Sequence, residues 1–311
     1  MIVTDEAKNP AIASIESMIR LRHAARELHG FPNSPVRQIT SGSHKSRIRG
    51  RGMDFEEVRI YQAGDDVRTI DWRVTARSHN TYTKIYTEER EKPLVVITDL
   101  RATMFFGSQR LKSVAASEVS AALAWAALSS NDRLGGIVFG QEKTASIKPR
   151  RSHHSVLNYI RSLNNLSAEL LNPRQDCYTL AEIFEETQRF LMPGSTLFIV
   201  SDFLDFDEHS HHLLFKLVRH SKVYFCHIFD PLEEELPPPG FYAVTDGDRR
   251  TLLNTSSKTL RDSYRHTYQE HVKHLQKISD QLKIGLISFN CSMDIMQVLG
   301  RVFGKHSRKK K

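Results

Sequence analysis

The clearest pattern in the sequence is a series of short, continuous apolar runs that alternate with longer amphipathic stretches, from residue 93 onward. The apolar runs have the length of strands and predict buried strands at 94–98, 134–139, 195–200, 223–229 and 284–289. Helical spacing between them predicts helices at 113–128, 152–163, 180–191, 209–219, 256–282 and 293–303, and residues 143–148 can pair with the second strand as a hairpin. Alternating strands and helices imply βαβ crossovers. We therefore predict an α/β fold with a mostly parallel, doubly wound sheet.

The chain ahead of this region is patterned differently. Apolar positions at near-helical spacing, with Pro10 at the first turn, predict a helix inside an N-terminal segment, residues 1–30. Residues 31–92 hold turn residues, a basic loop and a segment rich in Arg and Asp. We expect them to pack against the sheet domain, residues 93–304, which a basic disordered tail follows at 305–311.

Two carboxylates stand where ligands bind in such sheets, beyond the carboxyl ends of the parallel strands. Asp99 ends the first predicted strand, and Asp202 follows the third. This placement makes both of them candidate site residues. The simpler alternative is that each carboxylate caps the helix that follows its strand.

Composition narrows the class of protein. Hydrophobic residues make up 40% and charged residues 26%, with 44 Lys and Arg against 36 Asp and Glu, values that fit a globular protein with a real core. No apolar run approaches the roughly 20 residues that span a bilayer, and no signal-peptide pattern opens the sequence. The three cysteines (Cys177, Cys226 and Cys291) are far apart, which favours reduced thiols. We therefore expect a cytoplasmic protein without a membrane span.

Positive charge is concentrated in two places. Five Lys or Arg residues and no acid lie between residues 37 and 51, and the last four residues are all basic. Such clusters can bind nucleic acid or an acidic surface, although a solvated loop and tail is the favoured interpretation. Because no aromatic residues interleave with the basic ones, a stacking platform for single strands is missing, which argues against nucleic acid as a partner.

Common catalytic motifs are absent from the sequence. It contains no Gly-x-x-x-x-Gly-Lys-Ser/Thr phosphate loop and no Gly-x-Ser-x-Gly elbow, and its histidines do not fall at zinc-site spacing. We therefore expect a protein that is not an enzyme and that needs no cofactor.

The most specific pattern lies between residues 50 and 77. It reads as a strand, a Gly-Asp turn and a charged segment, in which arginines can form planar, bidentate pairs with aspartates. The residues that define it are Arg59, Tyr61, Gly64, Asp65, Asp66, Arg68, Asp71, Trp72 and Arg77. Such a lattice either locks the turn as a structural network or presents a surface to a partner.

This segment, followed by a buried strand that ends in Asp99, closely resembles the signature of the bacterial domain-of-unknown-function-58 (DUF58) family. The later Ser201-Asp-Phe203 and Asp230-Pro231 also fit, so that the resemblance runs from the basic loop to about Phe303. It implies a von Willebrand factor A-like domain. It also implies a partnership with MoxR-type AAA+ ATPases in the maturation or assembly of complexes, with other von Willebrand A-like proteins as further partners.

Von Willebrand A-like domains carry a metal-ion-dependent adhesion site that begins with Asp-x-Ser-x-Ser, so the resemblance implies such a site here. Asp99 and Thr103 match the first and last positions, Thr179 is a candidate for the threonine of a second loop, and Asp202 matches the aspartate of a third. Carboxylate and hydroxyl oxygens suit Mg²⁺. Arg101, however, takes the place of the middle serine and has no acceptor atom.

Two arrangements follow from Arg101. If it points away, the four oxygen-bearing residues still hold Mg²⁺. If it turns inward, it pairs with Asp99 and Asp202 and replaces the ion by a fixed positive charge. We favour the second, because a cation beside a divalent ion costs several kcal/mol even at an effective dielectric of about 20.

These observations lead to one main hypothesis and two alternatives. The main hypothesis is a non-enzymatic interaction module with a degenerate adhesion site that acts with a MoxR-type ATPase. One alternative is a protein that binds nucleic acid or an acidic surface through its basic loop and tail. The other is a metal-dependent hydrolase that uses Asp99 and Asp202, which lacks an evident general base.

Overall fold

The computed structural model describes residues 9–28, 53–62, 67–78, 80–88, 93–172, 174, 178–245 and 250–304. The chain divides into two compact units: residues 1–36 together with 92–311, here called the sheet unit, and residues 37–91, here called the hairpin unit. The basic loop at 37–51 and the tail at 305–311 lie outside the described residues. The boundaries that we predicted, and the packing of segment 31–92 on the sheet, stay predictions.

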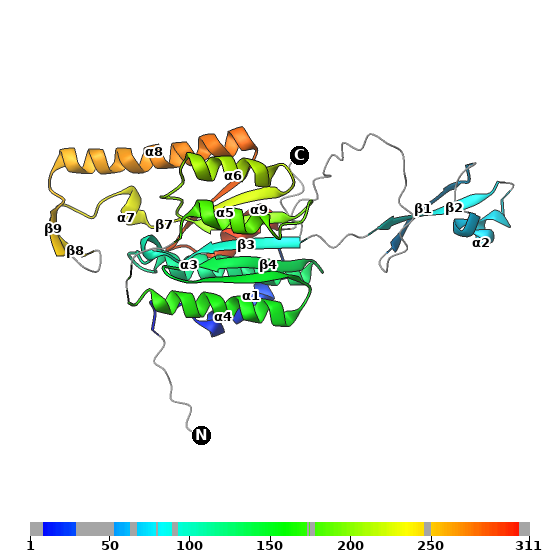
Figure 1. Cartoon of the computed structure of the whole chain (residues 1–311), viewed down its shortest axis with the longest axis horizontal. Coiled ribbons are helices and arrows are strands. Elements are labelled where there is room, and N and C mark those ends of the chain that lie inside the picture. Colours follow the sequence, from blue (N-terminus) through cyan, green and yellow to red (C-terminus); the bar gives the residue numbers. More distant parts are fainter. Residues whose placement is uncertain are drawn as a thin grey trace, which may run out of the picture. The chain divides into compact units, whose positions relative to one another are not determined.

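The sheet unit is built on a six-stranded sheet with the strand order β10-β7-β6-β3-β4-β5 (Figure 1). Its strands are β3 (Pro93–Asp99), β4 (Arg133–Phe139), β5 (Thr144–Arg150), β6 (Thr196–Ser201), β7 (Lys222–Phe229) and β10 (Gly285–Asn290). All neighbours are parallel except β4 and β5, which form an antiparallel hairpin. The central strands β3 and β6 are buried at every position, which is why they read as unbroken apolar runs. The predicted α/β class is confirmed.

Helices cover both faces of this sheet. Side chains of β3 alternate between the two cores: Leu94 and Val96 pack on one side, and Val95 and Ile97 on the other. The first core is closed by α1 (Ile15–Ala25), α3 (Lys112–Ser129), α4 (His153–Glu169) and α9 (Ile295–Phe303). The second is closed by α5 (Leu180–Gln188), α6 (Glu208–Val218) and α8 (Lys258–Leu282). In Figure 1, α4 lies below the sheet and α6 and α8 lie above it.

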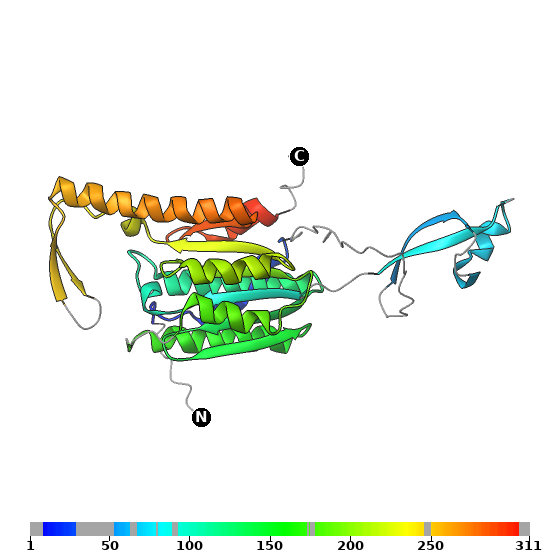
Figure 2. The ribbon, with the colours of Figure 1, turned by 45° about the horizontal axis from the view of Figure 1, so that its top comes forward.

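Several short elements connect this framework. The 3-10 turn η2 (Ala102–Met104) follows β3, and α7 (Pro231–Glu234) follows β7. Next comes an antiparallel pair of strands, β8 (Phe241–Thr245) and β9 (Arg250–Asn254), here called the ribbon. The ribbon leads directly into α8, and Figure 2 shows it at the end of that helix.

The hairpin unit consists of two antiparallel strands and two short helical segments. These are β1 (Met53–Ile60), η1 (Val67–Thr69), α2 (Trp72–Thr75) and β2 (Tyr82–Glu88). The carboxylate of Asp71 accepts hydrogen bonds from the backbone N–H groups of Arg73 and Val74, so it caps α2. Of the hairpin-unit side chains whose burial is described, only Thr83 is buried.

Candidate functional site

The loop after β3 holds a buried ion-pair network centred on Arg101. Its Nε and Nη2 donate to the two carboxylate oxygens of Asp99 at 3.0 and 2.7 Å, and its Nη1 and Nη2 donate to those of Asp205 at 2.5 and 2.8 Å. Nη1 also donates to the backbone carbonyl of Tyr178, and the guanidinium lies 5.0 Å from the ring centre of Phe139. Burial opposes the charged guanidinium, but the two aspartates outweigh it and raise the pKa of Arg101 above its usual value. The arginine is a fixed cation held by two forked contacts.

A second buried cation, Lys112, lies at the first position of α3. Its Nζ donates to Asp202 at 2.9 Å and to Glu233 of α7 at 2.6 Å, and the lysine side chain is 1% exposed. Burial alone would raise the pKa of Asp202; the charge of Lys112 and a hydrogen bond from the Thr103 hydroxyl lower it below its usual value. The backbone N–H of Leu204 also donates to Asp202. Asp202 is therefore an ionised carboxylate that depends on Lys112.

The loop after β6, whose Asp202 and Asp205 pair with the two cations, has a strained backbone. Phe203, between Asp202 and Leu204, has a backbone φ of 58°, which non-glycine residues rarely adopt. Its ring is buried and lies 4.5 Å from that of Phe225 in β7, while Leu204 beside it is 55% exposed. Ion pairs at residues 202 and 205 and the buried ring between them hold this backbone in place.

The structure brings together most of the residues that we predicted for this site, but in a different pairing. Asp99, Arg101, Thr103 and Asp202 gather at the carboxyl ends of β3 and β6, and Arg101 turns inward. The predicted pairing of Arg101 with Asp202 is wrong: Arg101 takes Asp205, because Lys112 already neutralises Asp202.

The hydrogen bonds of Thr179 run to its own helix, α5, and not to the residues of this site. Its hydroxyl accepts from the backbone N–H of Glu182, and its own backbone N–H donates to the Glu182 carboxylate, which together form a capping box at the start of α5. Lys112 is the residue that sequence reasoning missed. Its one signal was a lysine at the start of an otherwise apolar helix, where the helix dipole disfavours a cation.

The donor set of this site does not fit a magnesium ion. Asp99 and Asp202, the two carboxylates that an adhesion site would use, are each saturated by a cation of the chain itself. Within the described part of the chain, no three His, Cys, Asp or Glu side chains are arranged to hold a metal ion.

Two histidines connect this site to α8. The Nε2 atom of His271 lies 2.9 Å from the backbone carbonyl oxygen of Asp202. The centre of the His271 ring lies 5.7 Å from that of the His227 ring in β7. Burial lowers the pKa of His227 to about 4, with His271 adding to the effect, so this ring is neutral at ordinary pH.

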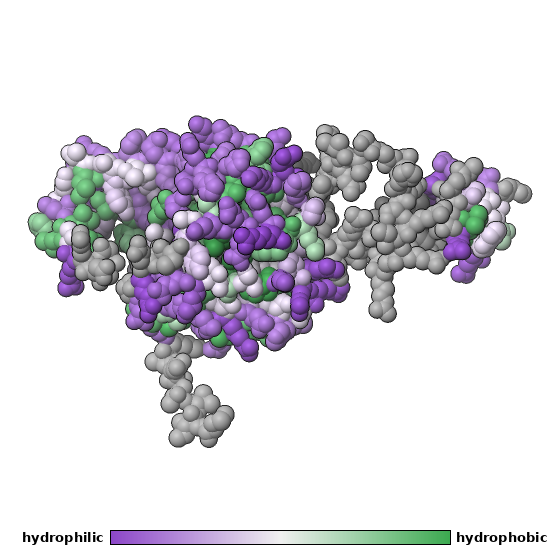
Figure 3. Space-filling view, viewed as in Figure 1, coloured by the Kyte–Doolittle hydropathy of each residue, from purple (hydrophilic) through white to green (hydrophobic). Residues whose placement is uncertain are grey.

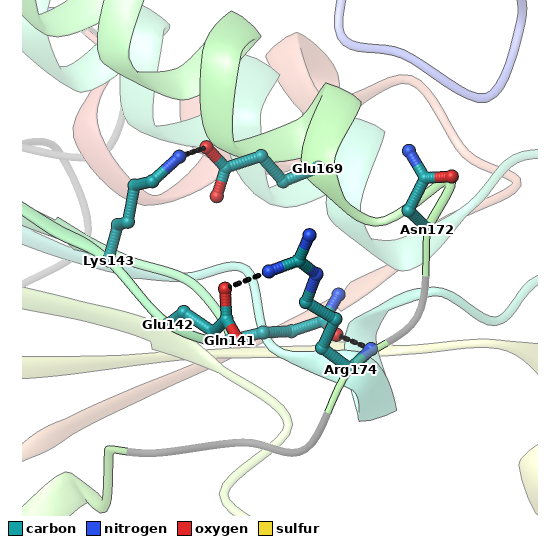
Figure 4. Close-up of a pocket in the computed structure, with 6 residues that line it drawn as sticks. All are labelled: Gln141, Glu142, Lys143, Glu169, Asn172 and Arg174. Carbon is teal, nitrogen blue, oxygen red and sulfur yellow. Dashed lines mark hydrogen bonds and ion pairs between the residues drawn. The ribbon is translucent and has the colours of Figure 1, made fainter.

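A cavity of about 150 Å³ lies elsewhere, at the β4–β5 turn and the end of α4 (Figure 4). Ligand pockets are typically about 300–1,000 Å³. Its charged side chains already pair with each other: Lys143 with Glu169, and Arg174 with Glu142, both at 2.5 Å. This cavity is therefore a weaker candidate than the carboxyl-end network.

The signature residues lie in the hairpin unit as far as they are described. Asp71 is a helix cap, and Trp72 is 68% exposed. The remaining described members are Arg59, Tyr61, Arg68 and Arg77. Gly64, Asp65 and Asp66 lie outside the described residues, so the predicted arginine–aspartate lattice stays a prediction.

The family model described as "Protein of unknown function DUF58" matches residues 57–274. The chain belongs to this family. The predicted membership is thereby confirmed, and the match covers the signature residues from Arg59 to Arg77 and the site. Curated relatives include uncharacterized proteins of Mycobacterium tuberculosis (strain ATCC 25618 / H37Rv) and Mycobacterium bovis, each 27% identical over 278 residues, or 86% of this chain and 86% of the relative.

Solved structures resemble the chain over about two thirds of its length. The conserved hypothetical protein BatB from Bacteroides thetaiotaomicron is 13% identical with a TM-score of 0.46, covering 70% of this chain and 100% of BatB. The VWA domain of SpRpn10 is 10% identical with a TM-score of 0.41, covering 68% of this chain and 95% of that domain. Among the described helices, none is long and apolar enough to cross a membrane.

Proposed function

We propose that this protein is a non-enzymatic protein-interaction module with a degenerate adhesion site, and that its partner is a MoxR-type AAA+ ATPase engaged in assembling or maturing a complex. The observation that carries the proposal is the pair of buried cations, Arg101 and Lys112, which hold the carboxylates that a metal-dependent site would offer to an ion. Family membership supports the interaction role.

A partner at the carboxyl ends of β3 and β6 would be recognised by the side chains around the two cations rather than through a bridging metal ion. Asp205 and Glu233 are the outermost members of the network, with side chains 32% and 20% exposed. Exposed apolar residues stand on the loops that follow β3 and β6: Phe105, Phe106 and Leu204. Apolar anchors within a polar rim are typical of a protein interface.

The hydrolase alternative is weaker on this structure. A hydrolase that uses Asp99 and Asp202 would need carboxylates that Arg101 and Lys112 already neutralise. The nucleic-acid alternative stays a prediction, because the basic loop and tail that it would use lie outside the described residues. A cytoplasmic location belongs to the proposal and is supported by Cys226 and Cys291, which are buried with free thiols.

The test is direct binding of the purified chain to the MoxR-type ATPase in a fixed nucleotide state. Leu204→Glu should weaken binding at least tenfold, since it places a charge at the centre of the proposed interface. Phe215→Glu on α6, where Phe215 is 50% exposed, is the matched control and should change affinity less than twofold. Absence of binding by the wild-type chain would refute the partnership.

A further inference from the structure

One lysine of the sheet unit lies inside the protein. Lysines are almost always at the surface, and Figure 3 shows that hydrophilic residues cover most of the visible face of the sheet unit. Among the lysines whose burial is described, Lys112 alone is buried, and its side chain is 1% exposed. The centre of the Phe106 ring lies 6.0 Å from its Nζ atom. A primary amine in such surroundings can act as a nucleophile once it gives up its proton.

The Nζ atom of Lys112 contacts two carboxylates. It donates to Oδ2 of Asp202 at 2.9 Å and to Oε1 of Glu233 at 2.6 Å. The carboxyl carbon of Asp202 lies one C–O bond beyond the oxygen that Nζ contacts. The nitrogen and this carbon are therefore held beside each other by the fold, which removes most of the entropy cost of joining them.

The surroundings of Asp202 suit a carboxyl group that a nitrogen attacks. The backbone N–H of Leu204 donates to its Oδ1 at 3.3 Å, and the Thr103 hydroxyl also hydrogen-bonds to this carboxylate. Both donors face the negative charge that develops on a carboxyl oxygen when a nucleophile adds to the carbon. The Asp202 side chain is 3% exposed, so bulk water has little access to an amide formed there.

Glu233 is positioned to carry a proton between the two groups. Its Oε1 contacts the nitrogen of Lys112, and its Oε2 accepts the backbone N–H of Asp230 at 2.9 Å in the capping box of α7. The carboxylate is thus fixed beside the amine. A carboxylate at this distance can remove a proton from the nitrogen and return it to a departing oxygen.

We propose that Lys112 and Asp202 condense to an amide cross-link within the folded chain, with Glu233 as the proton carrier. Nζ first gives one proton to Oδ2 of Asp202 across their hydrogen bond, and the neutral nitrogen then adds to the carboxyl carbon. Glu233 removes a second proton from the nitrogen and delivers it to the departing hydroxyl. One N–C bond forms, one C–O bond breaks and one water leaves. Of the three ammonium protons, one stays on the amide nitrogen and two leave with the oxygen, so no oxidant, reductant or cofactor is needed.

The condensation is a slow reaction of the folded protein. The charges of Asp202 and Glu233 outweigh burial and raise the pKa of Lys112 above its usual value, so the ion pair predominates over the neutral pair that reacts. The protein therefore folds with the ion pair and acquires the cross-link with time. The amide would join the start of α3 to the loop after β6, 90 positions apart in the sequence, and closing so long a loop stabilises the fold. None of this depends on the partner proposed above.

Intact-mass spectrometry of the purified full chain, before and after a week at 37 °C, tests the proposal. A species lighter by the mass of one water molecule should accumulate in the wild type, and tryptic digestion should yield a branched peptide that joins Lys112 to Asp202. Lys112→Met should keep its full mass. Glu233→Gln, which preserves the size of the side chain and removes the proton carrier, should form the species at least about tenfold more slowly. Lys143→Met is the matched control: it removes a lysine from an exposed ion pair and should cross-link at the wild-type rate.

The wild-type measurements decide the matter even where a variant folds poorly. A wild-type chain that keeps its full mass through the week overturns the proposal. A loss of water that gives no branched peptide, or that persists in Lys112→Met, belongs to dehydration elsewhere in the chain and overturns it as well. A cross-link that forms equally fast in Glu233→Gln would refute the part assigned to the glutamate. Cross-linked molecules should melt roughly 10 °C above freshly folded protein.

Discussion

Replacing Lys112 by methionine tests the central claim about the site, that a fixed cation supports a buried carboxylate. Methionine keeps most of the volume and the apolar stem but removes the charge. Asp202, whose side chain is 3% exposed, then loses the partner that holds its pKa low, and its remaining hydrogen bonds come from Thr103 and the N–H of Leu204. The Glu233 side chain is 20% exposed, so water solvates part of its charge when the lysine is removed.

The size of the effect follows from the burial of the pair. Removing one partner of a buried ion pair costs about 3–5 kcal/mol, because the other charge is left uncompensated. For a unit of this size, that corresponds to a melting temperature roughly 6–20 °C lower at pH 7. Lys143→Met is the matched control. Its ion pair with Glu169 is exposed, and such pairs contribute about 0–1 kcal/mol.

The contribution of Asp202 to folding stability should change with pH in opposite directions in the wild type and in Lys112→Met. In the wild type, the pKa of Asp202 is below its unfolded value of about 3.8, so its stabilisation is present above that pH and is lost as the pH falls through the lower, folded value. In Lys112→Met, burial dominates and raises that pKa. The folded variant then binds a proton more readily than the unfolded chain, and lowering the pH restores stability.

The assay is chemical denaturation of both proteins at several pH values between 7 and 4. The difference in unfolding free energy between wild type and Lys112→Met should be largest at pH 7 and shrink on acidification. A loss below 1 kcal/mol at pH 7, or a difference that does not depend on pH, would show that Asp202 does not rely on this lysine.

Three further outcomes are expected. Because burial lowers the pKa of His227 to about 4, the folded state resists its protonation and wild-type stability should fall from pH 6.5 toward 4, by up to about 1.4 kcal/mol per pH unit; melts of His227→Gln should show a shallower fall. The double variant Arg101→Ser, Lys112→Ser should gain melting temperature with millimolar Mg²⁺, as calorimetry can confirm, whereas a wild-type gain that Asp99→Ala abolishes would contradict the fixed-cation site. Tyr159→Phe should cost about 1 kcal/mol on denaturation, since it removes the buried hydroxyl 2.6 Å from that of Thr98; no loss would mean that this bond contributes nothing.

The framework of the fold was predictable because its central strands are buried on both faces. A strand such as β6 shows an unbroken apolar run, and parallel neighbours require helices between them. The ribbon was missed for the opposite reason. β8 and β9 are five residues each and mostly exposed, and no hydrophobic alternation marks a pair of strands that the described residues leave largely uncovered.

The site was predictable in its carboxylates but not in its pairing. Strand ends locate Asp99 and Asp202, since the carboxyl ends of parallel strands meet at one edge of the sheet. The partner of each depends on which cation the following segments bring back to that edge. Lys112 returns there at the start of α3, and Asp205 lies three residues beyond Asp202. A lysine at the start of an apolar helix is an unusual feature, but it does not say which carboxylate the lysine meets.

The pairing has a consequence for the loop after β6. Each cation takes one carboxylate from the loop after β6 and one from elsewhere: Arg101 joins Asp205 to Asp99, and Lys112 joins Asp202 to Glu233. The loop is thus clamped at both ends around the strained Phe203. A metal ion can leave such a site and let the loop relax, whereas a lysine and an arginine cannot. The loop after β6 is therefore preorganised at all metal concentrations.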